Sequence, residues 1–199
     1  GRKRIPEPVD ILDRDAFEKE LNELGSLRAK ADAIRTRLAK SINTKYQENP
    51  AYYENFSKRI KEALELYKAR TITEAEYLAK MRDILEDYRT GKSAIAYPNR
   101  IRANVHAQAF YGVLTAIFSN EKLSVEPDFA AEMALDITTI IEKHSQVDWT
   151  HNLTIHDRIS QDIDDLFYRY QKEMGLVLSF DVIDMIIENV KTVALRRFA

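Results

Sequence analysis

The sequence predicts an all-α protein, an irregular multi-helix array in two packed helical subdomains. Only 5 Gly and 5 Pro occur among 199 residues, which does not favour a sheet protein with many turns. Hydrophobic residues make up 45% of the chain and charged residues 31%, as in globular domains. Apolar positions recur at helical spacing almost throughout, and no fixed-period repeat or low-complexity tract interrupts them.

The first two helices are expected on either side of Gly25. A short helix is predicted from Asp13 to Leu24, because Gly25 suits the left-handed conformation that follows a helix C-terminus. Ser26 is then in position to cap a second helix. One apolar stripe runs along that helix, formed by Leu27, Ala31, Ile34, Leu38 and Ile42.

Two further start signals follow. Asn49-Pro50 combines a capping residue with proline at the first helical position and opens a third helix. Thr73 and Glu76 form a capping box before a fourth. The apolar positions of these two helices are Phe56, Ile60, Leu64 and Tyr67, then Tyr77, Met81, Ile84, Leu85 and Tyr88.

A loop between Thr90 and Pro98 is the predicted boundary of the two subdomains. We therefore expect a basic N-terminal helical subdomain at 13–92 and an acidic C-terminal helical subdomain at 93–199. Residues 1–12 carry positive charge but no apolar segment behind it, so they do not resemble a signal peptide. We expect them to be a linker from upstream domains, and the chain to be a fragment of a longer protein.

Four more helices are expected in the second half. They are predicted at Arg100–Phe118, at Pro127 to about His144, at Leu153–Met174 with Gly175 closing it, and after a Ser179 cap. Trp149 falls in a connecting segment. The stripe of the last helix is predicted to comprise Phe180, Ile183, Ile187, Val190 and Ala194.

Charge is distributed unevenly along the chain. Residues 1–118 contain 22 Lys and Arg against 17 Asp and Glu, whereas residues 119–199 contain 8 against 15. A polyanion is therefore expected to be attracted to the first half, and a basic partner to the second.

Several classes of chemistry lack their motifs. Cysteine is absent, which excludes disulfides, a thiolate nucleophile and a cysteine zinc site, and fits a reducing cytoplasm. No apolar run approaches the roughly 20 residues of a membrane span, so no membrane partner is expected. The phosphate-binding loop, the dinucleotide fingerprint and the nucleophile elbow are also missing. We predict no catalytic residue and no cofactor.

Two polar groups are weighed as metal sites. His151 and His156 are spaced by five residues, which does not place both on one helical face. Asp162, Asp164 and Asp165 resemble an acidic metal cluster, but arginines at 158 and 169 predict helical ion pairs with Asp162 and Asp165. A small enzyme that combines these groups remains an alternative, although we expect no metal.

A basic strip is the candidate DNA interface. Lysines and arginines on one helix could pair with phosphates of double-stranded DNA independently of sequence. The alternative is a solvated helix face with intrahelical pairing. The candidate DNA-binding residues are Arg28, Lys30, Arg35, Arg37, Lys40, Lys45, Lys58 and Arg59.

A second candidate surface lies in the acidic half. Its last helices carry apolar residues on more than one face, which indicates either a central position in the core or docking on another chain. The candidate partner-binding residues are Trp149, Phe167, Met185 and Ile186.

Several segments together resemble one family. They are Leu24-Gly25-Ser26, Lys30–Ile34, Asn49–Tyr53 with Phe56-Ser57, Thr73–Tyr77, Val147–Thr150, Asp162–Leu166 and Leu178–Asp181 leading to Ile183–Ile187. In this order they resemble the C-terminal region of the motor (restriction) subunit of bacterial type I restriction–modification enzymes, from about Asp15 to the end.

The resemblance implies a helical domain without catalytic residues. In that family the nuclease carboxylates and two helicase-like ATPase domains, which use ATP and Mg, lie upstream. The C-terminal region helps to join the motor to the methyltransferase and specificity subunits. The expected function is therefore assembly and DNA contact within an ATP-dependent endonuclease. The alternative is a purely structural helical domain that packs on the upstream helicase domains.

Overall fold

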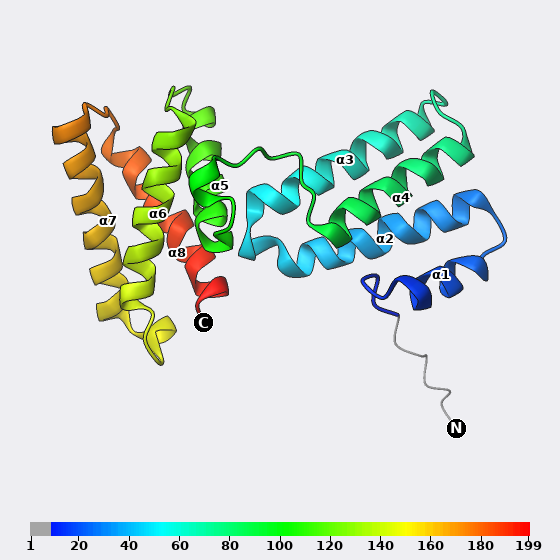
Figure 1. Cartoon of the computed structure of the whole chain (residues 1–199), viewed down its shortest axis with the longest axis horizontal. Helices are drawn as coiled ribbons and strands as arrows, with labels where there is room; N and C mark the ends of the chain where they lie inside the picture. Colours follow the sequence, from blue (N-terminus) through cyan, green and yellow to red (C-terminus); the bar gives the residue numbers. More distant parts are fainter. Residues whose placement is uncertain (1–8) are drawn as a thin grey trace. The chain divides into compact units, whose positions relative to one another are not determined.

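The computed structural model describes residues 9–199, so the first eight residues of the predicted linker 1–12 lie outside the described residues. Within that range the chain forms eight α-helices and three short 3-10 helices, with no strand (Figure 1). The α-helices are α1 Arg14–Asn22, α2 Leu27–Lys45, α3 Pro50–Lys68, α4 Glu74–Thr90, α5 Val105–Asn120, α6 Pro127–His144, α7 Leu153–Met174 and α8 Phe180–Arg197. The 3-10 helices are η1 Tyr46–Glu48, η2 Asn99–Ile101 and η3 Trp149–His151. The predicted all-α multi-helix class is confirmed.

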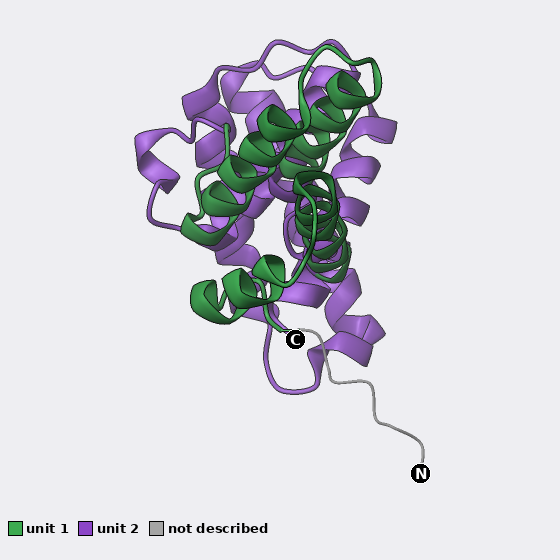
Figure 2. Ribbon diagram, turned by 90° about the vertical axis from the view of Figure 1, so that its right-hand side faces the viewer, with its two compact units in different colours: residues 1–44, 54–94 green, residues 45–53, 95–199 purple. Residues whose placement is uncertain are grey.

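The helices divide into two compact units, coloured separately in Figure 2. Among the described residues, unit 1 comprises 9–44 and 54–94, and unit 2 comprises 45–53 and 95–199. The segment 45–53, which contains η1 and the first turn of α3, is thus grouped with the C-terminal helices, whereas the predicted boundary places it in the 13–92 subdomain.

Side-chain caps fix the helix starts of unit 1, and those at Ser26 and Thr73 are the ones that the sequence predicts. Asp13 and Ser26 accept hydrogen bonds from the backbone N–H groups of residues 16 (3.1 Å) and 29 (3.0 Å). Thr73 Oγ1 accepts from the N–H of Glu76 at 3.1 Å, and the Glu76 carboxylate accepts from the N–H of Thr73 at 3.2 Å. Because each cap uses residues within three positions, local sequence suffices to specify it.

The core of unit 1 is made by one face of each of α1 to α4. Leu27 belongs to the predicted stripe of α2 but is exposed, because it is the first residue of the helix and lies at the margin of the core. Ala63 is fully inside on α3, where the neighbouring predicted Leu64 is only half-buried. The largest fully buried side chains are Phe17, Leu21, Ile34, Leu38, Ile42, Phe56, Tyr77 and Met81.

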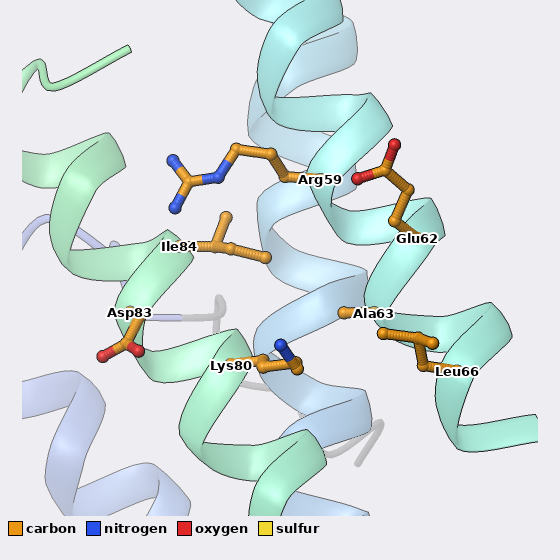
Figure 3. Close-up of a pocket in the computed structure, with 7 residues that line it drawn as sticks. All are labelled: Arg59, Glu62, Ala63, Leu66, Lys80, Asp83 and Ile84. Carbon is orange, nitrogen blue, oxygen red and sulfur yellow. The ribbon is translucent and has the colours of Figure 1, made fainter. Parts of the chain in front are cut away.

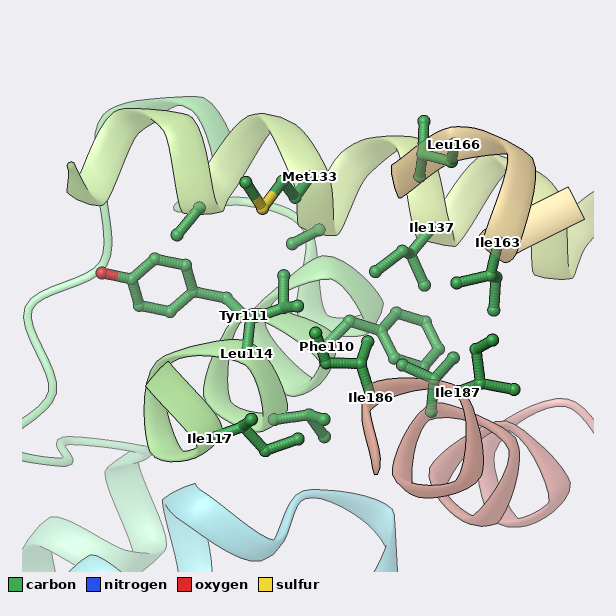
Figure 4. Close-up of a cluster of buried hydrophobic side chains, with 14 of the residues drawn as sticks. Phe110, Tyr111, Leu114, Ile117, Met133, Ile137, Ile163, Leu166, Ile186 and Ile187 are labelled. Atoms are coloured by element: carbon green, nitrogen blue, oxygen red, sulfur yellow. The ribbon is translucent and has the colours of Figure 1, made fainter. Parts of the chain in front are cut away.

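Unit 2 is organised around α5, which is buried on most of its circumference. Helices α6 and α8 pack against α5, and α7 packs against α6 and α8. Figure 4 shows the four helices contributing to one cluster of side chains. Those labelled are Phe110, Tyr111, Leu114 and Ile117 of α5, Met133 and Ile137 of α6, Ile163 and Leu166 of α7, and Ile186 and Ile187 of α8.

Two expectations in unit 2 are wrong in detail. The helix predicted over Arg100–Phe118 is a 3-10 turn followed by α5, because Asn104 accepts a hydrogen bond from the N–H of Ala107 at 3.0 Å and caps a later start. Phe180 is 85% exposed rather than part of the stripe of α8, since it is the first residue after the Ser179 cap. No helix in residues 9–199 is both long enough and apolar enough to cross a membrane.

Candidate nucleic-acid and partner interfaces

Arg37, one of the eight predicted DNA-binding residues, holds unit 1 together. Its guanidinium donates to Glu20 at 2.7 Å, joining α2 to α1, and lies 5.4 Å from the ring centre of Phe17. Only 16% of its side chain is exposed. Its charge is therefore matched within the protein and largely inaccessible to a phosphate.

Arg59 has the same kind of role between α3 and α4. It donates to Asp87 at 2.7 Å and lies 5.8 Å from the ring centre of Phe56. Figure 3 shows the Arg59 side chain extending from α3 towards α4 beside Ile84, in a groove between the two helices. Glu62 and Asp83 also line this groove, so its charge is mixed and does not favour an anion.

Arg28 and Arg35 share one carboxylate on their own helix. Asp32 lies 3.7 Å from Arg28 and 3.5 Å from Arg35. Arg35 also donates to the hydroxyl of Tyr77 at 3.2 Å, and that hydroxyl donates to Asp32 at 3.1 Å. Burial is the largest cause that raises the pKa of Tyr77, so the phenol remains a neutral donor. This is the intrahelical pairing that the sequence offers as the alternative to DNA binding.

The four lysines of the predicted set are placed differently. Lys40 and Lys58 are exposed, and Lys30 and Lys45 are half-buried. Within residues 9–199 none of the four makes an ion pair, although Lys30 acts electrostatically on Glu18. Lys45 belongs to unit 2 and the other three to unit 1. The positive charge of the strip that makes no ion pair within residues 9–199 is thus carried by lysine.

The predicted partner-binding residues lie mostly in the core of unit 2. Phe167 and Ile186 are fully buried. Trp149 is 2% exposed, and its indole N–H donates to the carbonyl of Phe198 at 2.8 Å. Only Met185, at 38% exposed, reaches the surface. The other three side chains can stabilise the unit but cannot contact a partner while it is folded.

A different apolar surface appears where α7 turns into α8. Met174, Val177 and Phe180 are all exposed, within seven residues of chain around Gly175. We name these three residues the α7–α8 corner. Asp181 and Asp184, both exposed, follow it in the first turns of α8. Sequence patterning missed the corner because Phe180 continues the helical spacing of buried residues.

The polar groups considered as a metal site are used in structural contacts. Asp162 pairs with His144 of α6 at 2.6 Å and with Lys143 at 3.8 Å. The ion pairs predicted from Arg158 to Asp162 and from Arg169 to Asp165 are not formed in the described chain, because α6 supplies closer partners for Asp162 and Gln161 donates to Asp165 at 2.9 Å.

The two histidines of the alternative enzyme site do not converge either. His151 is exposed, while the ring of His156 packs 5.6 Å from that of Trp149. In residues 9–199 no group of three or more His, Asp or Glu side chains is placed to hold a metal ion.

Comparison with known proteins identifies the family. The sequence profile described as "Type I restriction enzyme HindI endonuclease subunit-like, C-terminal" matches residues 5–194. The chain is 23% identical over 154 residues to the type I restriction enzyme HindI endonuclease subunit of Haemophilus influenzae. That alignment covers 77% of this chain and 14% of the relative. No solved structure matches it. Because the profile spans nearly all the described helices, the chain belongs to the family of C-terminal domains of HindI-like type I restriction endonuclease subunits.

Proposed function

We propose that this chain is the non-catalytic assembly and DNA-contacting domain of an ATP-dependent type I restriction motor subunit. The family match over residues 5–194 carries the proposal, since the aligned relative is itself named an endonuclease subunit. Nuclease and ATPase chemistry, with ATP and Mg, would belong to the rest of such a subunit, acting in the bacterial cytoplasm. This domain would contact duplex DNA and help to dock the motor on the methyltransferase–specificity core.

The DNA contact is assigned to Lys30, Lys40 and Lys58 of unit 1. These side chains lack ion pairs within residues 9–199, so neutralising a phosphate would not require breaking an internal contact. Lysine is a strongly hydrated point charge on a flexible stem, which suits backbone contact independent of base sequence. Arg37 and Arg59 are removed from the proposed interface because their carboxylate partners already neutralise them.

Docking on the core is assigned to the α7–α8 corner of unit 2. Large exposed apolar side chains gain most from burial against a partner. The neighbouring Asp181 and Asp184 favour a surface of the methyltransferase subunit that combines apolar and basic residues. Met185, the one exposed member of the predicted partner set, lies on the same helix.

Sedimentation of the chain with the purified methyltransferase–specificity core, with and without duplex DNA, tests the docking. We expect a complex without DNA, and its loss on Val177→Ser together with Phe180→Ser. The control is Val105→Ser with Val147→Ser, which removes two other exposed apolar side chains of unit 2. A complex that survives the first pair and not the second would refute the assignment.

Duplex titration tests the DNA contact. Replacing Lys30, Lys40 and Lys58 by Gln should lower affinity on the order of 100-fold at about 0.1 M salt, since each phosphate contact contributes roughly 0.9 to the salt slope. The control replaces Lys19, Lys80 and Lys92, three other exposed lysines of unit 1, and changes the charge equally. Equal losses of affinity in both variants would show that DNA binding depends on the net charge and not on these three lysines. Absence of both DNA and core binding would leave the purely structural domain.

A further inference from the structure

Three cations from different segments of unit 1 line one cleft. Arg28 lies in the first turn of α2, Lys68 ends α3, and Arg70 stands in the turn that leads to α4. The cleft is completed by Tyr67, Ile72, Thr73 and Glu74. Residues 42 positions apart are thus brought to one place, which composition alone could not predict. We name this site the Arg70 cleft.

Positive charge exceeds negative charge in the Arg70 cleft. Lys68 and Arg70 make no ion pair within residues 9–199, and Arg28 has only the 3.7 Å contact with Asp32. Glu74 is the one carboxylate among the lining residues, and it accepts a hydrogen bond from Tyr67 at 3.4 Å. Three cations facing one carboxylate repel one another, so a bound anion would relieve that repulsion.

Of the two helix starts around the cleft, that of α2 adds to the positive potential. Helix α2 begins beside Arg28 and has no acidic residue in its first turn, so its N-terminal partial charge is not offset there. Thr73, the N-cap of α4, also lines the cleft, but Glu74 and Glu76 in the first turn of α4 offset the partial charge at that helix start. Lys68 also complements the C-terminus of α3, a role that needs no ligand. Arg70 follows the helix by two residues, where a cation can also interact with the C-terminus of α3.

Arg70 occupies a backbone position that favours glycine. Its φ is 58°, and the helix end is closed by a bond from the N–H of Thr71 to the carbonyl of Leu66 at 2.9 Å. Gly91 and Gly175 hold the left-handed position after α4 and α7. At Arg70 the chain instead keeps an arginine in this strained conformation, and the arginine makes no ion pair within residues 9–199. Within residues 9–199, Lys122, with φ 55° in unit 2, is the other basic residue in this conformation after a helix and provides a matched control.

We propose that the Arg70 cleft binds a phosphate group of the duplex DNA backbone. This inference rests on the proposed DNA contact and adds a site that the lysine strip does not include. Arg70 would donate its planar guanidinium N–H groups to the phosphate oxygens, with Arg28 and Lys68 completing the charge. The contact would carry no base specificity, because only phosphate oxygens are recognised.

The test compares Arg70→Gly with Lys122→Gly. Each replaces a strained cation by the residue that its backbone favours, so both should keep or raise the thermal midpoint. We expect Arg70→Gly to weaken binding of a short duplex about 5- to 10-fold and to lower the salt slope by roughly 0.9, while Lys122→Gly leaves both unchanged. A structural role of Arg70 alone would give equal duplex affinities in the two variants and would overturn the proposal.

Two further arms separate this site from the proposed function. Wild-type chain that binds duplex, together with an Arg70→Gly variant that binds equally well, refutes the Arg70 cleft and leaves the lysine contact standing. Loss of affinity on replacing Lys30, Lys40 and Lys58, with the Arg70→Gly effect additional to it, supports both. Titration with inorganic phosphate identifies the source: binding of free phosphate at Arg70 without any duplex affinity would overturn the assignment to DNA.

Discussion

The close approach of α5 to the first turn of α3 depends on Gly112. Both segments belong to unit 2. A Cβ atom on Gly112 would lie 2.7 Å from Cβ of Ala51 and 3.6 Å from Oδ1 of Asn49. Non-bonded carbon atoms prefer about 3.5–4.0 Å, so the new methyl group would overlap Ala51 by roughly 1 Å. Ala51 has no side-chain torsion that could relieve the overlap, and the backbone must move.

Gly112→Ala is therefore expected to destabilise unit 2. Overpacking of this kind costs about 1–3 kcal/mol, and the better helix propensity of alanine offsets about 1 kcal/mol of it. The net loss in the free energy of unfolding should be about 1 kcal/mol. Ala51→Gly removes the atom that Gly112→Ala meets, so the double variant should show a favourable coupling of about 1–2 kcal/mol.

Tryptophan fluorescence during denaturant unfolding measures this prediction directly. Trp149 is the one tryptophan of the chain and is buried in unit 2, so its emission follows that unit. Gly25→Ala, a control in unit 1 followed by circular dichroism, should not destabilise its unit by overlap, since a Cβ there would meet nothing within 4 Å. A Gly112→Ala variant as stable as wild type, with no coupling to Ala51→Gly, would refute the predicted overlap.

Two other variants test the charges of each unit. Arg37→Gln should lower the stability of unit 1 by about 1–2 kcal/mol, because it leaves Glu20 without its 2.7 Å partner, whereas Lys40→Gln should change the stability little; circular dichroism during urea unfolding compares them. His106 accepts a hydrogen bond from Arg197 at 3.0 Å, and burial, followed by the Arg197 charge, lowers the His106 pKa. The contribution of neutral His106 to the free energy of unfolding is therefore present above the ordinary histidine pKa of about 6.5. It is lost as the pH falls through the lowered pKa of the folded state. His106→Gln should make the free energy of unfolding, followed by Trp149 fluorescence, depend less on pH in the acid range. An unchanged pH dependence would contradict the assignment of a neutral His106 in the folded state.

The sequence predicts helix boundaries well because capping is local. Ser26, the Thr73–Glu76 box and Ser179 each bond to backbone within three residues. Helix α5 starts later than the apolar pattern predicts, because Asn104 caps a start within that continuous pattern. Local signals thus determine where helices start, and a misassignment arises where two of them disagree.

Burial and charge pairing could not be predicted in the same way, since they depend on distant partners. Arg37 and Arg59 find their carboxylates 17 and 28 positions away. Trp149 is fixed by the carbonyl of Phe198, 49 positions along the chain. A basic or aromatic residue can therefore be predicted from the sequence to bind a partner, although in the folded chain it contacts a distant residue of the same chain.

Arginine and lysine have different roles in unit 1, and both proposals depend on that difference. Arginine presents a planar fork that pairs bidentately and stacks on rings, while lysine remains hydrated. The arginines that join helices through carboxylates are Arg14 with Glu86, Arg37 with Glu20, Arg59 with Asp87 and Arg82 with Glu18. Counting every cation of α2 and α3 as DNA-binding thus overestimates the interface, because several of the arginines already form ion pairs inside the unit. Lysines of α2 and α3, among them Lys30, Lys40 and Lys58, make no ion pair within residues 9–199 and can reach a phosphate. Arg70 departs from this rule, as an arginine without a carboxylate in a conformation that favours glycine. An external anion such as a phosphate would supply the negative charge that the Arg70 guanidinium does not find within the described residues of unit 1.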